Sequence, residues 1–181
     1  MLKLYKGGNY INSERMQEIS REILDFKMPR YENLTHINLY LEQVIDEVVF
    51  ILEPIFGNNS DKWITPTMVG NYVKQGLLPR PVGKKYTKEH IAYLIYISLA
   101  KQVLSICEIK RLMDIQKNSY PISIVYDYFC TEFESILTHV FGTSEDTMDT
   151  SAPHVLEANV LRSTVISVCY AIYTRKMLEI Y

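Results

Sequence analysis

The sequence predicts a mainly α-helical protein in which one short β-hairpin lies between the central helices. Apolar residues recur at spacings of three and four in several segments, as they do on the buried face of a helix. Capping residues and prolines mark where these segments begin and end. With 7 glycines and 7 prolines in 181 residues, the chain has too few turn residues for a sandwich of many strands. Its 48% hydrophobic content predicts a folded core.

Two helices are predicted in the N-terminal part of the chain. The first covers residues 14–26 and ends before Pro29, because the residue that precedes a proline is disfavoured in helical geometry. The second begins near Asn38, and its apolar side chains between Leu41 and Leu52 form one stripe. Pro54 and Gly57 are expected to close this second helix.

A short helix follows, and both of its ends are marked. Thr65 is a good N-cap, and Pro66 suits the first turn, where its missing N–H costs nothing. Gly76 suits the left-handed position after the last turn, and Pro79 prevents the helix from continuing. Val69, Tyr72 and Val73 form the inward stripe, so the outward positions are Thr67, Gly70, Asn71 and Lys74.

Residues 80–86 are strongly basic, and Gly83 allows a tight turn, so this segment is predicted to form the β-hairpin, or wing. Thr87 caps a helix over residues 88–103 that is apolar almost all round, which is typical of a central, buried helix. Ser105 and Glu108 form a capping box that opens a further helix to about residue 115.

Two longer helices are predicted at the C-terminal end, over residues 121–141 and 153–179, with a polar, acidic linker at 142–150 between them. The predicted organisation is an N-terminal helical arm at 1–35, a winged helix-turn-helix at 36–116 and a C-terminal helical region at 117–181. The helical region would serve dimerisation or hold an effector. Its tyrosines, such as Tyr120 and Tyr126, could line an effector pocket or a subunit interface, or could pack in the ordinary way.

The net charge of −2 conceals an uneven distribution. Residues 62–117 contain ten basic and three acidic residues, a net +7, whereas residues 1–61 carry −4 and residues 118–181 carry −5. A basic middle between acidic flanks is compatible with a polyanion-binding face and equally with a solvated, lysine-rich surface.

The central segment resembles the DNA-binding domain of MerR-type regulators. The resemblance covers residues 63–113 and rests on Gly-Leu-Leu-Pro at 76–79, Tyr-Thr at 86–87 and Leu-Ser-x-x-Glu-Ile-Lys-x-Leu at 104–112. It implies a MerR-like winged helix-turn-helix. The chain also resembles a bacterial family that is defined by a domain of unknown function with a MerR-like core.

This resemblance implies a transcriptional regulator that binds double-stranded DNA. The helix after Thr65 would enter the major groove, where Thr67 and Asn71 would meet base edges and basic side chains would neutralise phosphates. Where MerR-type regulators carry an arginine and an aromatic residue, this chain has Gly70 and Asn71. The expected DNA-binding residues are Thr65, Thr67, Asn71, Lys74, Arg80, Lys84, Lys85 and Lys88.

Other function classes receive less support from the sequence. The four histidines show no metal-ligand spacing, no catalytic motif is recognisable, and no cofactor is implied. His90 is expected to make a local contact at a helix terminus. The three cysteines are expected to be buried thiols in the cytoplasm, since no signal peptide or membrane segment is recognisable. A homodimer through the C-terminal helices is expected; the alternative to DNA binding is a winged-helix module for protein–protein interaction.

Overall fold

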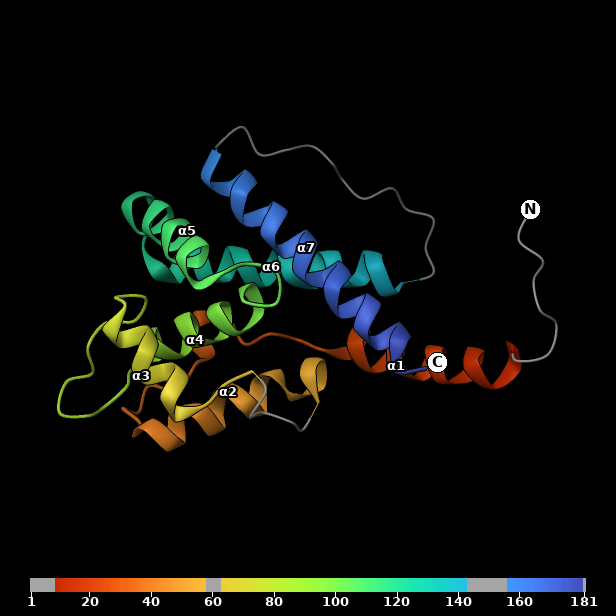
Figure 1. The fold of residues 1–181 in the computed structure, drawn as a ribbon, viewed down its shortest axis with the longest axis horizontal. Helices are drawn as coiled ribbons and strands as arrows, with labels where there is room; N and C mark the ends of the chain where they lie inside the picture. Colours follow the sequence, from red (N-terminus) through yellow and green to blue (C-terminus); the bar gives the residue numbers. More distant parts are fainter. Residues whose placement is uncertain (1–8, 58–62, 143–155, 181) are drawn as a thin grey trace.

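The computed structural model describes residues 9–57, 63–142 and 156–180 (Figure 1). In these residues the chain forms seven α-helices and a single turn of 3-10 helix, with no β-strand. The elements are α1 (Asn9–Asp25), η1 (Tyr31–Asn33), α2 (Leu41–Phe56), α3 (Pro66–Lys74), α4 (Lys88–Ala100), α5 (Ile106–Ser119), α6 (Ile122–Phe141) and α7 (Leu156–Leu178).

The prediction of a MerR-like winged helix-turn-helix is wrong, because the described residues contain no β-hairpin that could form the wing. Residues 80–86 take part in only two isolated bridges, Val82 with Lys85 and Leu39 with Tyr86. The Lys85 N–H donates to the Val82 carbonyl oxygen at 3.0 Å and closes a tight turn. A ladder cannot extend from this turn, because Pro81 has no N–H to donate and α4 begins directly after Thr87.

Several helix boundaries differ from those predicted. α1 begins at Asn9 rather than at residue 14, and α2 begins at Leu41 after an N-cap at Tyr40. Pro54 does not end α2, since it lies in the last turn, where the helix loses only one hydrogen bond before Gly57. α4 ends at Ala100, and residues 101–104 form turns. The predicted linker residues 143–150 and the predicted start of the last helix at Pro153 lie outside the described residues.

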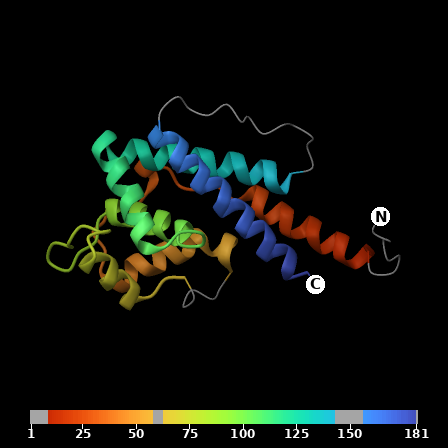
Figure 2. The same ribbon diagram turned by 45° about the horizontal axis from the view of Figure 1, so that its top comes forward.

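α4 occupies the centre of the helical assembly and contacts α2, α6 and α7. Ile91, Leu94, Ile95, Ile97 and Leu99 are all fully buried, which confirms the prediction of a central helix. The longest helices, α6 and α7, pack against each other, and α1 packs on α6 (Figure 2). α2 and α3 cover the other side of α4, and α3 lies at the end of the molecule opposite α1 (Figure 1).

A partly buried ion pair joins the segment after α1 to α6. Arg30 places its guanidinium 2.8 and 3.0 Å from the two carboxylate oxygens of Glu134, which also accepts the Met28 N–H at 2.8 Å. Burial opposes ionisation of Glu134, but the hydrogen bonds from Arg30 and Met28 outweigh it and hold the pKa of the carboxyl below its usual value. This pair fixes α1 and η1 against the C-terminal helices.

The three cysteines divide into two classes. Cys130 and Cys169 are buried, as expected, and burial raises the pKa of the Cys130 thiol to about 12. Cys107, in the first turn of α5, is exposed, contrary to expectation. No described helix is both long enough and apolar enough to span a membrane.

Candidate nucleic-acid interface

α3 is held in the protein by one face and exposes the other. Thr65 accepts the Met68 N–H through Oγ1 at 3.2 Å, which confirms it as the N-cap, and Pro66 occupies the first turn. Val69 and Tyr72 are buried against the core. The opposite face exposes Thr67, Asn71 and Lys74, which follow one another at spacings of four and three residues; we call these three residues the α3 face.

The C-terminal end of α3 is also fixed. Gly76 has a φ of +74°, as predicted, and the N–H groups of Leu77 and Leu78 both reach the carbonyl oxygen of Tyr72, at 2.9 and 3.3 Å. From α5, Lys110 donates a hydrogen bond of 2.8 Å to the carbonyl oxygen of Gln75. A cation at this position also complements the negative end of the helix dipole.

The segment that follows α3 is tied to α4 by His90. The ring accepts the Thr87 N–H at Nδ1 (3.0 Å), and its Nε2 lies 3.2 Å from the Pro79 carbonyl oxygen. Burial lowers the pKa of His90, and the Pro79 contact opposes this only in part. The neutral ring therefore carries its proton on Nε2 and donates to Pro79. The expected local contact at a helix terminus is confirmed.

Two basic residues of this segment are exposed, and two others contact side chains from the N-terminal part of the chain. Arg80 and Lys84 are exposed, and Lys84 lies at the tip of the turn with a φ of +62°. Lys85, in contrast, places its Nζ 3.4 Å from the centre of the Tyr40 ring. Lys88 lies 3.3 Å from a Glu32 carboxylate oxygen and 4.6 Å from the centre of the Tyr31 ring.

The structure therefore brings together part of the predicted set. The exposed polar and basic members are Thr67, Asn71, Lys74, Arg80 and Lys84. We call the last two the basic turn. Lys84 shares one hollow with Pro66 at the start of α3 and with Tyr40 and Glu42 at the start of α2. Thr65 serves as a cap, and Lys85 and Lys88 face aromatic rings.

Sequence reasoning missed how many central lysines serve the fold. Lys101 donates 2.7 Å to the Trp63 carbonyl oxygen, and its burial lowers its pKa. Lys117 places its Nζ 4.7 Å from the Tyr93 ring centre. Together with Lys85, Lys88 and Lys110, these residues already have partners within the chain, so half of the ten basic residues at 62–117 make intramolecular contacts. Their partners lie far away in sequence, so spacing carried no signal for them.

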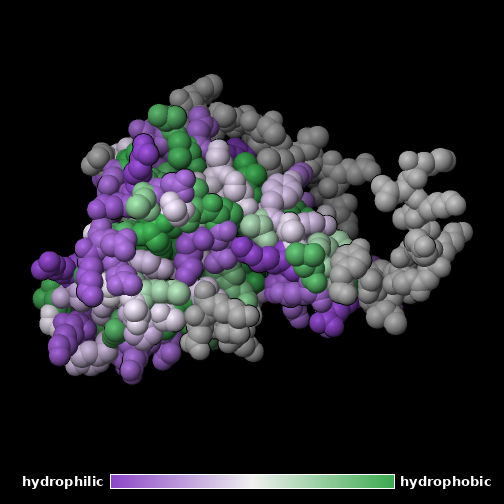
Figure 3. Space-filling model, viewed as in Figure 1, coloured by the Kyte–Doolittle hydropathy of each residue, from purple (hydrophilic) through white to green (hydrophobic). Residues whose placement is uncertain are grey.

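At the end of the molecule where α3 and the basic turn lie, hydrophilic side chains are mixed with paler and hydrophobic ones (Figures 1 and 3), and Val82 of the same turn is 86% exposed. Among the described residues, no group of three or more histidine, cysteine or acidic side chains is arranged to hold a metal ion.

Residues 29–129, more than half of the chain, match the family described as a domain of unknown function, DUF1836. The chain belongs to this family. The predicted resemblance is confirmed in this coarser form, and the match carries no link to MerR-type regulators. The family segment contains α2 to α5, and therefore the whole α3 face and basic turn. No match to a curated protein or to a solved structure is found.

Proposed function

We propose that this member of the family binds double-stranded DNA through the α3 face and the basic turn and acts as a transcriptional regulator. The observation that carries the proposal is the one-sided exposure of α3. Its inner face is buried through Val69 and Tyr72, while Thr67, Asn71 and Lys74 are exposed together. Asparagine can pair bidentately with adenine, and lysine neutralises a phosphate.

The dimensions of α3 suit a major groove. An α-helix with its side chains is about 10–12 Å across, and the major groove is about 12 Å wide. The caps at Thr65 and Gly76 keep the helix rigid, so its outward side chains have a fixed register. The motif resemblance to MerR-type regulators, in Gly-Leu-Leu-Pro at 76–79, supports the proposal without any part played by a wing.

The electrostatic support is local. Lys74, Arg80 and Lys84 are exposed at one end of the molecule. The acidic Glu42, which shares the hollow beside Lys84, opposes their positive charge at that point. With three exposed cations in the proposed footprint, we expect a binding constant that falls with salt at a slope of about −2 to −3 in logarithmic units.

Fluorescence anisotropy tests the proposal directly. A labelled duplex of mixed genomic sequence is titrated with the full chain at about 50 mM and about 200 mM salt, where we expect binding that weakens steeply between the two conditions. Absence of binding at the lower salt concentration would overturn DNA binding. The result would then favour the second candidate function, a module for protein–protein interaction.

A specific apolar patch favours self-association. Near the end of α5 and the starts of α6 and α7, Ile115, Tyr120, Ile124 and Leu156 are exposed, Leu156 by 70%. The Gln116 side chain donates 2.7 Å to the Glu157 carbonyl oxygen and holds the end of α5 beside α7. We call the four exposed residues the C-terminal patch. Tyr120 and Ile124 line one hollow beside α7, and exposed apolar side chains that lie near one another are typical of interfaces.

We propose a homodimer through the C-terminal patch. Light scattering should give twice the mass of the chain, and Ile124→Glu should give the monomer, because a buried unpaired charge disfavours the interface. Leu178→Glu is the matched control, since Leu178 is 67% exposed near the other end of α7. A wild-type protein that remains monomeric at high concentration would refute the dimer.

A further inference from the structure

Phe50 is exposed on the outer face of α2, although phenylalanine is usually buried in folded proteins. Its exposed fraction is 75%, whereas Val48 and Leu52 of the same helix are fully buried. Asp46 and Pro54 lie four residues before and after Phe50 and are exposed on the same face. The outer face of α2 therefore presents a phenyl ring to solvent rather than to the core.

Phe50 lines a groove between α2 and the segment that runs from the end of α1 to η1. The groove has a volume of about 620 Å³. Its lining includes Asp25, Pro29, Glu47, Phe50 and Pro54, which all retain accessible surface; we call these five residues the α2 groove. An apolar side chain that enters the groove would contact the phenyl ring and two prolines.

Carboxylates surround the ring. Asp25 and Glu47 belong to the groove, and on the surface of α2 Asp46 precedes Phe50 by four residues while Glu53 follows it by three. None of these four carboxylates forms an ion pair with any residue that the structure describes. They are therefore available to meet the cations of a partner.

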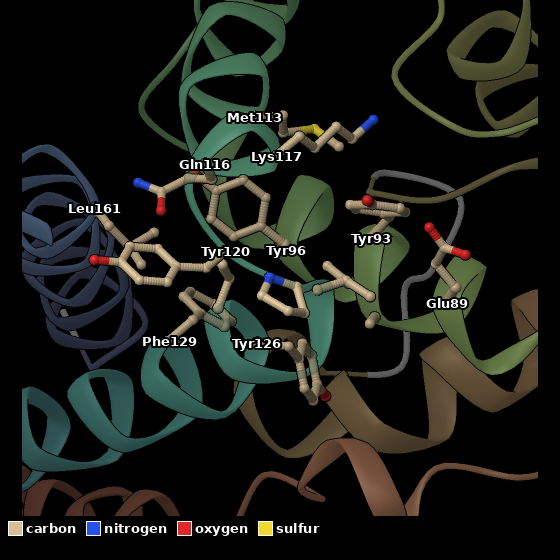
Figure 4. Close-up of a pocket in the computed structure, with 14 residues that line it drawn as sticks. Glu89, Tyr93, Tyr96, Met113, Gln116, Lys117, Tyr120, Tyr126, Phe129 and Leu161 are labelled. Carbon is tan, nitrogen blue, oxygen red and sulfur yellow. The ribbon is translucent and has the colours of Figure 1, made fainter. Parts of the chain in front are cut away.

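The charge at the groove is unbalanced. Of the described residues that line it, Lys27 is basic, and two are acidic. The pocket between α4, α5 and α6 is different, because Glu89 and Lys117 flank the same tyrosine there (Figure 4). Glu89 is hydrogen-bonded to the Tyr93 hydroxyl, and the Lys117 Nζ lies 4.7 Å from the centre of the Tyr93 ring. The α2 groove, in contrast, can select a partner by the sign of its charge.

This sign narrows the class of partner. The four carboxylates would repel the phosphates of a nucleic acid and the headgroups of an anionic membrane. A two-fold contact with a second copy of the chain would place this acidic surface against itself, which is unfavourable because like charges repel. A cationic protein segment that carries an apolar side chain satisfies both the charge and the groove.

We propose that the α2 groove docks a short segment of a partner protein in which a bulky apolar side chain is flanked by lysine or arginine. The apolar side chain packs against Phe50 and Pro54, while the flanking cations meet Asp46 and Glu53. An arginine can also stack on the phenyl ring. The groove shares no residue with the α3 face, the basic turn or the C-terminal patch, so this docking site does not depend on DNA binding or on the dimer.

A library of random short peptides displayed on phage tests the assignment. It is selected on the immobilised full chain at about 50 mM salt, where attraction between exposed charges is weakly screened. We expect the enriched peptides to carry an aromatic or large aliphatic residue between lysines or arginines. One enriched peptide is then titrated into the isotope-labelled full chain, and the amide shifts in heteronuclear NMR should fall on the α2 groove.

Phe50→Gln should weaken binding of that peptide about tenfold, because it removes most of the apolar surface that the peptide buries. The variant should fold normally, since the ring is exposed. Leu178→Gln is the matched control, because Leu178 is an apolar side chain of α7 that is 67% exposed, and it should leave the affinity unchanged. Light scattering tests the other occupant: loss of a wild-type dimer in Phe50→Gln alone would assign the groove to a second copy of the chain and overturn the proposal.

The double variant Asp46→Asn and Glu53→Gln should weaken binding about threefold to tenfold and make it less sensitive to salt. Glu14→Gln with Asp114→Asn is its control, since this pair removes two exposed carboxylates from α1 and α5 and should change neither quantity. Absence of enriched peptides, enrichment of peptides without basic residues, or an affinity that is unchanged in Phe50→Gln would each refute the docking site.

Discussion

The Nε2 atom of His90 lies 3.2 Å from the carbonyl oxygen of Pro79, and this contact joins the first turn of α4 to the segment that follows α3. One neutral imidazole thus holds two elements that are separated by the basic turn. The position of Arg80 and Lys84 relative to the α3 face depends on this contact, because both residues lie between Pro79 and His90 in the chain.

Stability should depend on pH through His90. Because burial lowers the folded-state pKa below the ordinary 6.5, the contribution of the neutral ring is complete above about pH 6.5. It declines as the pH falls through that value toward the folded-state pKa. His90→Gln should therefore lower the free energy of unfolding by about 1 kcal/mol near pH 8 and by clearly less near pH 5, as measured by urea denaturation. His36→Gln, at an exposed position, is the control; an equal loss at both pH values would contradict the assignment.

Thr65 should affect stability rather than DNA contacts. Thr65→Ala removes the acceptor for the Met68 N–H and should lower the free energy of unfolding by about 1 kcal/mol. Thr65→Ser keeps the hydroxyl and should retain most of that stability. Both variants are compared by thermal and urea unfolding. If alanine and serine were equally destabilising, the cap would not be the role of this residue.

Lys74 and Lys84 should control the salt dependence of duplex binding. The double variant Lys74→Gln and Lys84→Gln removes two exposed cations without adding charge, so the salt slope should become shallower by about 1.8. Affinity should fall alike for all sequences. The control is Lys176→Gln, because Lys176 lies on α7 and pairs with Glu179. An unchanged slope would remove the basic turn from the interface. Lys85 is left intact, since it packs over Tyr40.

Asn71 should carry sequence preference. Asn71→Ala removes the outward amide in the middle of the α3 face without disturbing the buried side of the helix. Discrimination between duplexes selected from genomic DNA and random duplexes should fall by about 1–3 kcal/mol, while binding to random duplexes changes little. Competition anisotropy measures both quantities. A uniform loss across all duplexes would identify Asn71 as a backbone contact.

Local signals in the sequence predicted the local structure well. Thr65, Gly76 and the Ser105–Glu108 capping box act within a few residues of themselves, and each is found where its chemistry required. The capping box is complete: the Ser105 N–H donates to Glu108 at 2.7 Å, and the Glu108 N–H donates to the Ser105 hydroxyl at 3.3 Å. Helix ends are encoded locally because unpaired N–H and C=O groups must find partners nearby.

The features that sequence reasoning missed depend on distant partners. A glycine flanked by basic residues predicted a hairpin, yet a hairpin needs strands on both sides, and Pro81 and Thr87 leave no room for them. Lys85 was expected to meet phosphate and instead meets Tyr40, which is 45 positions earlier in the chain. The pocket lined by Tyr93, Tyr96, Tyr120 and Tyr126 could not be predicted as a whole from the sequence, because its lining residues come from α4, α5, α6 and α7.

The family segment and the folded unit do not share a boundary. The match ends at residue 129, inside α6, immediately before the buried Cys130 and Phe133. A fragment truncated there would leave Arg30 without Glu134 and would strip α7 from the core. Residues 29–129 therefore depend on the C-terminal half of α6 and on α7 to complete their hydrophobic core. If residues 29–129 were expressed alone, the aromatic face of α6 would be exposed to solvent.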